Sequence, residues 1–210
     1  MTILQILIVG LFLIVVVIAG FTAVSNWRTH QEWRREATQR GWRYTTVRWK
    51  QFAKPSYRIA GTTANGIVWE LHRSMHKGQL RFSWQTNDAH LPYGTLAMFP
   101  MGSKQLAPVK TEGPLYNNLE PLKQKAMPAK PPTWPDKYLI FASHNQLAAH
   151  LLLESVANVL NQYPDWPQNG SLEKLTWNPN RLFIVCLYKN EWTALDKLVA
   201  LGTALVQPSP

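Results

Sequence analysis

The hydrophobic pattern of this chain begins with an uninterrupted apolar run. Residues 3–24 contain no charged side chain, and Gln5, the one strongly polar residue, lies near one end of the run. At about 1.5 Å of rise per residue, a helix of this length extends about 30 Å, the thickness of the hydrocarbon core of a bilayer. The pattern therefore predicts a single transmembrane helix, which we expect to form a membrane anchor at residues 1–25.

A cleaved secretory signal is the alternative interpretation of this run. Ala23, Val24 and Ser25 have small side chains of the kind found at a cleavage site. A signal peptide, however, has basic residues before a shorter apolar segment, and no basic side chain precedes Ile3. The sequence therefore favours a helix that is retained as an anchor.

Residues 26–41 are predicted to continue the helix as a basic juxtamembrane segment that ends at Gly41. Acidic and basic side chains recur there at spacings that allow ion pairs along a helix. Aromatic and basic residues just outside an apolar span are typical of the membrane interface, where they contact anionic headgroups. The candidate interface residues are Trp27, Arg28, Trp33, Arg34, Arg35 and Arg40. A plain solvated helix is the alternative.

From residue 42 onward the hydrophobic period changes from helical to alternating, which is typical of strands. Asn65-Gly66 separates two such runs and predicts a β-hairpin, since both residues tolerate positive φ. Further strands are expected at residues 80–85, 94–99, 138–142, 172–177 and 182–188, and helices at residues 147–160 and 192–205. This order predicts an α+β fold in which the N-terminal helix precedes a mostly antiparallel sheet with two covering helices.

The predicted α+β domain occupies residues 42–210 and contains a loop at residues 100–135 that is rich in proline and lysine. Eight of the fifteen prolines and five lysines fall in this loop. Proline lacks the backbone donor that the interior of a strand or helix requires, so we expect an irregular connection. Such a long loop is either a surface for a partner or a flexible linker.

Charge predicts which side of the membrane the domain occupies. Seven basic residues oppose two acidic ones between residues 28 and 50. Because an excess of Lys and Arg marks the cytoplasmic side, we expect the N terminus outside and the domain in the cytoplasm of the cell. Cys186 is the single cysteine and lies in an apolar run, which predicts a buried, reduced thiol. The net charge of +10 suits anionic lipid or nucleic acid, and the anchor favours lipid over nucleic acid.

Candidate chemistry is sparse. The chain has no phosphate-binding Gly-Lys loop, paired-cysteine motif, serine nucleophile elbow or His-Glu-x-x-His helix, and no cofactor or metal is predicted. Glu70, His72 and His76 form the one candidate ligand cluster, because alternate residues of a strand share a face. The same alternation places Trp69 and Leu71 inside, so this face is equally well the exposed side of the sheet.

Two small residues in the apolar run carry a further expectation. Ala19 and Ala23 are one helical turn apart, and such a pair allows a second transmembrane helix to approach closely. They are candidate helix–helix contacts with a membrane-protein partner.

The segments at residues 40–44 (Arg-Gly-Trp-Arg-Tyr), 57–61 (Tyr-Arg-Ile-Ala-Gly) and 66–71 (Gly-Ile-Val-Trp-Glu-Leu) resemble those of bacterial single-pass membrane-anchored proteins of uncharacterised function. The ending at residues 195–202 is also similar to theirs. The resemblance implies the architecture and transfers no catalytic residue. We therefore expect a non-enzymatic accessory or assembly subunit of a larger membrane complex. The alternative is a membrane-tethered enzyme, or a binder of metal or small molecules, that uses Glu70, His72 and His76.

Overall fold

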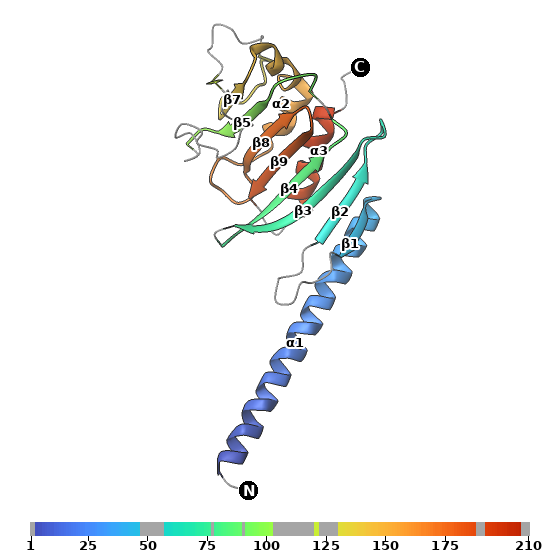
Figure 1. Ribbon diagram of the computed structural model, residues 1–210, viewed down its shortest axis with the longest axis vertical. Helices are drawn as coiled ribbons and strands as arrows, with labels where there is room; N and C mark the ends of the chain where they lie inside the picture. Colours follow the sequence, from blue (N-terminus) through green and yellow to red (C-terminus); the bar gives the residue numbers. More distant parts are fainter. Residues whose placement is uncertain are drawn as a thin grey trace. The chain divides into compact units, whose positions relative to one another are not determined.

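The structure is a computed structural model that describes residues 3–46, 57–76, 78–89, 91–102, 120–121, 130–187 and 192–206 (Figure 1). The chain forms two compact units, Met1–Tyr44 and Thr45–Pro210, which are considered separately below.

The first unit consists mainly of one continuous helix, α1 (Ile3–Gln39). The helix ends as the sequence predicts, because Gly41 adopts a positive φ of 71°. The amide of Trp42 donates to the carbonyl of Ala37 at 2.8 Å, and the amide of Gly41 donates to the carbonyl of Thr38 at 3.0 Å. These two bonds form a Schellman motif, which satisfies carbonyls that the end of a helix otherwise leaves unpaired. A short strand, β1 (Arg43–Thr46), follows.

The second unit contains an open antiparallel sheet whose strands run in the order β2-β3-β4-β9-β8-β5-β7-β6. The strands are β2 (Tyr57–Thr62), β3 (Val68–His76), β4 (Gln79–Thr86), β5 (Leu96–Pro100), β6 (Glu120–Pro121), β7 (Tyr138–Ala142), β8 (Leu172–Asn178) and β9 (Arg181–Leu187). The predicted α+β class is confirmed. The predicted proline-rich loop lies largely outside the described residues, except for its two ends and β6.

Two hairpins are built as their turn residues predict. β2 and β3 pair through Thr62 and Val68, and Gly66 in the connecting turn has φ of 85°. β8 and β9 are joined by a turn in which the side-chain oxygen of Asn178 accepts from the amides of Asn180 at 2.9 Å and Arg181 at 3.0 Å. These short polar turns fix the register of both pairs, and with it the face on which each side chain lies.

The helices differ in one respect from the prediction. A single helix across residues 147–160 is wrong, because the chain forms a 3-10 helix, η3 (Asn145–His150), and then α2 (Glu154–Leu160). Leu153 between them is extended, with φ of −98° and ψ of 145°. The side-chain oxygen of Ser143, just before η3, accepts a 3.0 Å hydrogen bond from the amide of Thr95. The final helix is α3 (Trp192–Val206), close to the predicted residues 192–205.

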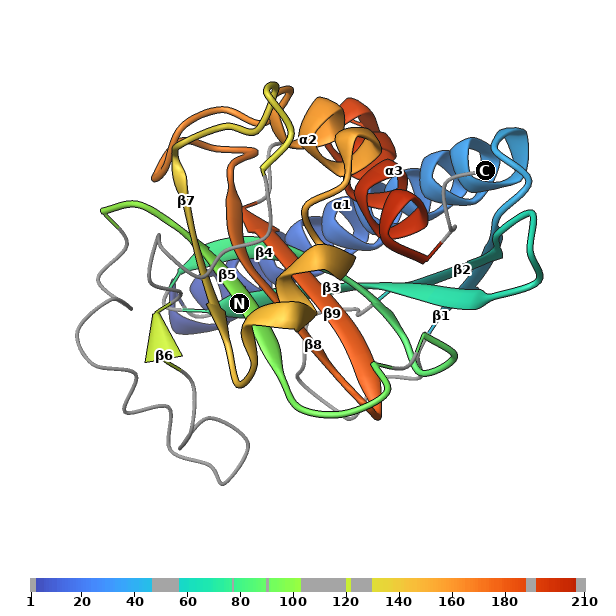
Figure 2. The ribbon, with the colours of Figure 1, turned by 90° about the horizontal axis from the view of Figure 1, so that it is seen from above.

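Helices α2 and α3 lie on one face of the sheet (Figure 2). Helix α3 lies close to the sheet at Gly202, where a Cβ atom would lie 2.4 Å from the indole of Trp84 on β4. Trp84 is fully buried and stacks on Trp69 of β3, with 6.4 Å between ring centroids. Cys186 is buried, as the sequence predicts, and burial raises the pKa of its thiol to about 12.

The opposite face of the sheet, called the polar face below, carries the polar side chains of β3 and β4, whereas β9 contributes Phe183, Val185 and Leu187 to it besides Arg181. Since neighbouring residues of a strand point to opposite faces, the position after Trp84 points away from α3. One register row across this face joins Glu70 of β3, Gln85 of β4, Phe183 of β9 and Thr176 of β8.

Candidate functional site

The apolar part of α1 is exposed along its whole described length. Large apolar side chains from Leu11 to Val24 are between 49% and 76% exposed. The segment Gly10–Gln39 has a mean hydropathy of 2.0 in its most apolar window, and none of that window is buried. Among the described residues, this is the one helix long and apolar enough to cross a membrane, and a signal sequence would pass the same test. The helix could therefore serve as a membrane anchor.

The hydroxyl of Thr22, within this apolar segment, is satisfied by the helix itself. The hydroxyl of Thr22 donates to the carbonyl of Ala19 at 2.8 Å and to that of Ile18 at 3.0 Å. Such bonds let a threonine lie in hydrocarbon, where an unpaired polar group costs several kcal/mol. Ala19 and Ala23 are exposed one turn apart. Their contact with another helix stays a prediction.

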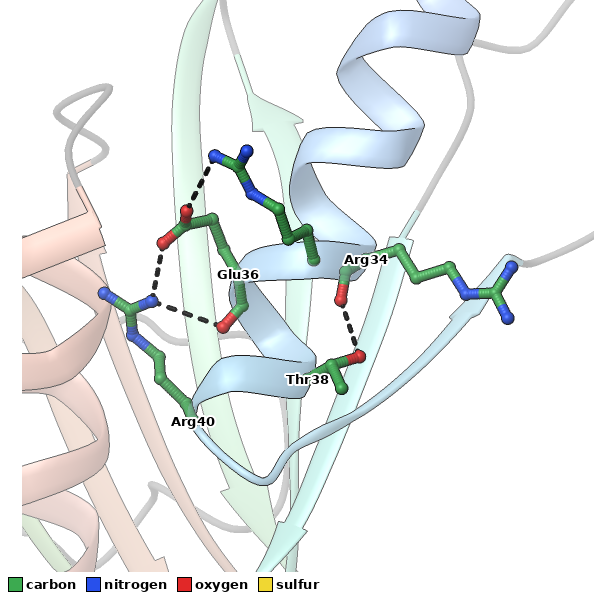
Figure 3. A network of polar contacts seen from close by, with 5 residues as sticks. Arg34, Glu36, Thr38 and Arg40 are labelled. Atoms are coloured by element: carbon green, nitrogen blue, oxygen red, sulfur yellow. Dashed lines mark hydrogen bonds and ion pairs between the residues drawn. The ribbon is translucent and has the colours of Figure 1, made fainter.

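Some of the predicted interface residues form ion pairs within the described part of α1, and others do not. Glu36 accepts from Arg40 at 2.8 Å and from Arg35 at 3.3 Å (Figure 3). The hydrogen bond from Arg40 is the main reason that the pKa of Glu36 lies below its ordinary value. The guanidinium of Arg34 points away from this network in Figure 3, although its carbonyl accepts from the hydroxyl of Thr38 at 2.8 Å. Arg40 is therefore held by the helix, and Arg34 is not.

The two candidate tryptophans also differ. Trp27 is 62% exposed, whereas Trp33 is 6% exposed. Arg28 is exposed, and no carboxylate in the described part of the chain pairs with Arg28 or Arg34. Trp27, Arg28 and Arg34 are thus the predicted interface residues whose polar or aromatic ends remain open to the surroundings of α1.

The candidate ligand cluster is assembled on the polar face of the sheet. Glu70 of β3 forms an ion pair with Arg58 of β2 and accepts a 3.1 Å contact from His72 Nε2. Gln85 of β4 contacts the same His72 nitrogen at 3.1 Å. Burial raises the pKa of Glu70, but the hydrogen bonds from Arg58 and His72 outweigh it and hold that pKa below its ordinary value. The carboxyl is therefore ionised at neutral pH.

The geometry of this cluster is that of a closed ion-pair network. Arg58 engages one oxygen of Glu70 and His72 engages the other. His76 is four residues after His72 on the same strand, but its side chain lies outside the described atoms. Among the described residues no three metal-binding side chains come together. The alternation itself is as predicted, because Trp69 and Leu71 are 2% and 1% exposed.

A small hollow lies beside the cluster. Its volume is about 190 Å³, below the 300–1,000 Å³ typical of pockets for small molecules. It is lined by Arg58, Val68, Glu70, Gln85, Thr86, Asn87 and Asp88. Asp88 accepts from the amide of Val68 at 3.1 Å, and Thr86 donates to the carbonyl of Val68 at 2.6 Å. Several polar groups in the wall therefore stabilise the strand itself.

A second charged cluster on the same face escaped the sequence analysis. Glu173, which is 2% exposed, pairs with Arg81 Nε at 2.7 Å. The register of β8 shifts between Leu172 and Lys174, so Glu173 lies at a bulge. A bulge depends on how two strands align, and alternation within β8 alone carries no sign of it.

Next to this ion pair, two cations share one aromatic ring. The ammonium of Lys174 on β8 lies 5.6 Å from the ring centroid of Phe183 on β9. The guanidinium carbon of Arg181 lies 4.6 Å from the same centroid. Both distances are within the range of cation–π attraction. Sequence reasoning could have noted that Arg181 and Phe183 alternate, but only the strand register brings Lys174 to them.

Comparisons with known proteins identify no family. No protein-family model matches this chain, and no curated protein sequence matches it. Among solved structures, the chain is similar to the crystal structure of the mycobacterial trehalose monomycolate transport factor A, TtfA, with a TM-score of 0.49. The two share 10% sequence identity over 86% of this chain and 97% of that chain. A likeness at this level carries no functional argument.

Proposed function

We propose that this protein is a single-pass membrane protein that acts, without catalysis of its own, as an accessory or assembly subunit of a larger membrane complex. The observation that carries the proposal is the apolar surface of α1, which no other part of the described chain covers between Leu11 and Val24. A surface of this kind is stable in hydrocarbon and unfavourable in water.

The estimated free energy of transfer favours insertion of residues 3–24 into a membrane. Each Leu, Ile, Val or Phe in the middle of a membrane helix favours insertion by about 0.3–0.6 kcal/mol. Residues 3–24 contain sixteen such residues. Together they favour insertion by about 5–10 kcal/mol, and no charged residue within the segment opposes it.

The accessory role is inferred from how the titratable side chains of the sheet are used. Glu70 is bonded to Arg58 and His72, and Glu173 is paired with Arg81. General acid–base or metal catalysis needs such groups to reach a substrate. In the described residues these carboxylates stabilise the sheet instead, which supports binding rather than catalysis.

Anionic headgroups are the proposed surroundings of the end of α1. At about 1.5 Å per residue, Arg28 lies about 6 Å and Arg34 about 15 Å beyond Val24 along the helix. The headgroup layer adds about 5–8 Å to each side of the hydrocarbon core, and attraction falls off over about 8 Å beyond it. Arg28 is therefore expected to contribute more than Arg34 to lipid contact, with Trp27 fixing the depth of the helix.

The anchor is tested by replacing Ile14 and Val17 with aspartate. Each aspartate near the middle of a span opposes insertion by about 2.5–3.5 kcal/mol, so the double variant should be extracted from membranes by alkaline carbonate. The wild-type chain, and a control with Ile14→Val and Val17→Ile, should stay in the membrane fraction. Extraction of the wild-type chain under these conditions would contradict the anchor.

The accessory role is tested by gentle extraction in an uncharged detergent, followed by native mass spectrometry of the full chain. We expect a discrete assembly that contains this protein and at least one other membrane protein in fixed ratio. A wild-type chain that is present only as a free monomer would overturn the accessory role and leave the anchor unaffected.

Lipid contact is tested by Arg28→Glu in nanodiscs that contain neutral and anionic lipid. The variant should retain fewer anionic lipids than the wild-type chain when the protein is released from the disc and weighed. Lys197→Glu, on α3, changes the net charge equally and serves as the control. Equal retention by the two variants would show that Arg28 has no special contact with headgroups.

A further inference from the structure

Within the described part of this face, the carboxylates of Glu70 and Glu173 form their ion pairs with residues other than the two cations above Phe183. On the described part of this face, Glu70 is engaged by Arg58, and Glu173 is engaged by Arg81. Lys174 and Arg181 make cation–π contacts with Phe183, and the ion pairs of the described residues on this face include neither of them. The central strands thus present two positive charges held in place by one ring.

The surroundings of Lys174 and Arg181 favour the binding of an anion. Arg181 is exposed, and Lys174 and Phe183 are partly buried. Burial lowers the pKa of Lys174, and the neighbouring guanidinium groups add to this effect, whereas Glu173 opposes it. An anion placed between the two cations would relieve their repulsion, and in a partly desolvated site its attraction is stronger than in water.

The geometry also distinguishes between kinds of anionic partner. A single-stranded nucleic acid binds to an open sheet by stacking bases on exposed aromatic rings. Here both cations lie over the ring of Phe183, so they occupy the surface on which a base would stack. Arg181 is exposed, and a guanidinium matches a carboxylate by two parallel hydrogen bonds.

The positions of the two cations along the strands suit an extended peptide. In the register of β8 and β9, Lys174 lies opposite Val185, on one side of Phe183, and Arg181 lies on the other side. The two side chains therefore converge on the ring from opposite directions along the sheet. In an extended peptide, alternate side chains share a face at intervals of about 7 Å, so two carboxylates in a Glu-x-Glu pattern can meet both cations.

We propose that Lys174, Phe183 and Arg181 form a docking site for an acidic, extended segment of the partner protein, whose carboxylates bind the two cations. This proposal rests on the accessory function and adds to it the surface and the chemistry of the contact. Phe183 is a positioning residue that holds the cations, and Lys174 and Arg181 are the groups that contact the ligand.

The test uses the full chain in uncharged detergent micelles at near-physiological salt. The probe is a fluorescent eight-residue peptide of alternating Gly and Glu, and a peptide of alternating Gly and Gln is its neutral counterpart. Fluorescence anisotropy should show saturable binding of the acidic peptide and at least tenfold weaker binding of the neutral one. Equal binding of both peptides would overturn the proposal.

The variant that removes the site is Lys174→Gln/Arg181→Gln, and the matched control is Lys130→Gln/Lys197→Gln, at two lysines outside the sheet. Both remove two positive charges from the chain, so a nonspecific attraction would weaken equally in both. We expect at least a tenfold loss of affinity in the first variant and less than a twofold change in the control. When Lys174 is replaced by arginine instead of glutamine, the positive charge is kept, and most of the binding should be kept with it. This variant separates the role of the charge from that of the packing of the lysine side chain.

Other outcomes are equally decisive. If the double glutamine variant fails to fold, judged by its tryptophan emission, Lys174→Met with Arg181 intact retains the buried stem and should still lose most of the affinity. If inorganic phosphate or oligothymidine displaces the peptide at lower concentration than free glutamate peptide does, the site recognises phosphate, and the proposed acidic segment is wrong.

Failure of this site and failure of the accessory function can be told apart. If the wild-type chain forms an assembly that the Lys174→Gln/Arg181→Gln variant leaves intact, the docking site is overturned and the accessory function stands. If the wild-type chain is a free monomer that still binds the acidic peptide through these residues, the site stands and the accessory function is overturned.

Discussion

Replacing Gly202 by alanine tests the contact between α3 and the sheet. In an exposed helix this substitution stabilises by about 1 kcal/mol, because alanine has the higher helix propensity. Here the new Cβ would lie 2.4–2.6 Å from three atoms of the Trp84 indole, so the ring has to move by about 1 Å to reach ordinary contact. The indole is fully buried and stacked on Trp69, whose own ring lies against Gly61.

The ring therefore has little room to retreat, and overpacking in such a core costs about 1–3 kcal/mol. With the cost at the upper end and the gain in propensity subtracted, we expect a net loss of about 2 kcal/mol in the free energy of unfolding. For a domain of this size, that loss lowers the melting temperature by about 4–8 °C.

The assay is thermal unfolding of the full chain in an uncharged detergent, followed by tryptophan fluorescence. Thr203→Ala, one residue further along α3, is the control, and its gain in helix propensity should raise the melting temperature by about 1–2 °C. Combining Gly202→Ala with Trp84→Phe should cost less than the sum of the two single changes, since the smaller ring makes room for the methyl group. If Gly202→Ala raises the melting temperature as Thr203→Ala does, the packing of α3 on β4 is wrong.

Three further predictions concern the thiol, the acid stability and the topology. Because burial raises the pKa of Cys186 to about 12, a thiol reagent at neutral pH should label the unfolded chain more than about 100-fold faster than the folded one, and similar rates would contradict the burial. Because the pKa of Glu70 is lowered in the folded state, its stabilising effect is present above the ordinary value of 4.5 and lost as the pH falls through the lowered value. Glu70→Gln should therefore flatten the acid dependence of the melting temperature, and an unchanged slope would refute the role of this carboxyl. A reporter that folds only in the cytoplasm, fused after Pro210, should be active, and activity only of an extracytoplasmic reporter would reverse the proposed orientation.

Several elements could be predicted because their signals are local. The apolar run, the glycine that ends α1 and the Asn-Gly turn each depend on residues close together in sequence, and the structure has α1 and the β2–β3 hairpin where these signals place them. The break between η3 and α2 was missed, since apolar spacing continues through Leu151 and Leu152 although Leu153 is extended. Burial of these leucines, rather than helix propensity, decides the path of the chain there.

The candidate site shows the same division. That Glu70 and His72 share a face follows from their two-residue spacing, whereas the ion pair of Glu70 with Arg58 depends on the alignment of β2 with β3. By contrast, the four-residue spacing of Glu36 and Arg40 allows an ion pair along a helix from sequence alone, and the structure shows this pair.

By itself, the sequence determined where hydrophobic surface is continuous, where the chain turns and which residues alternate, because these properties depend on neighbours within one or two turns or strand repeats. The tertiary structure decided which charges meet. The bulge at Glu173, its pairing with Arg81 and the convergence of Lys174 and Arg181 on Phe183 all arise from the register of β4, β9 and β8. Register brings together residues that are far apart in sequence, and a shift of one residue would send each of these side chains to the opposite face.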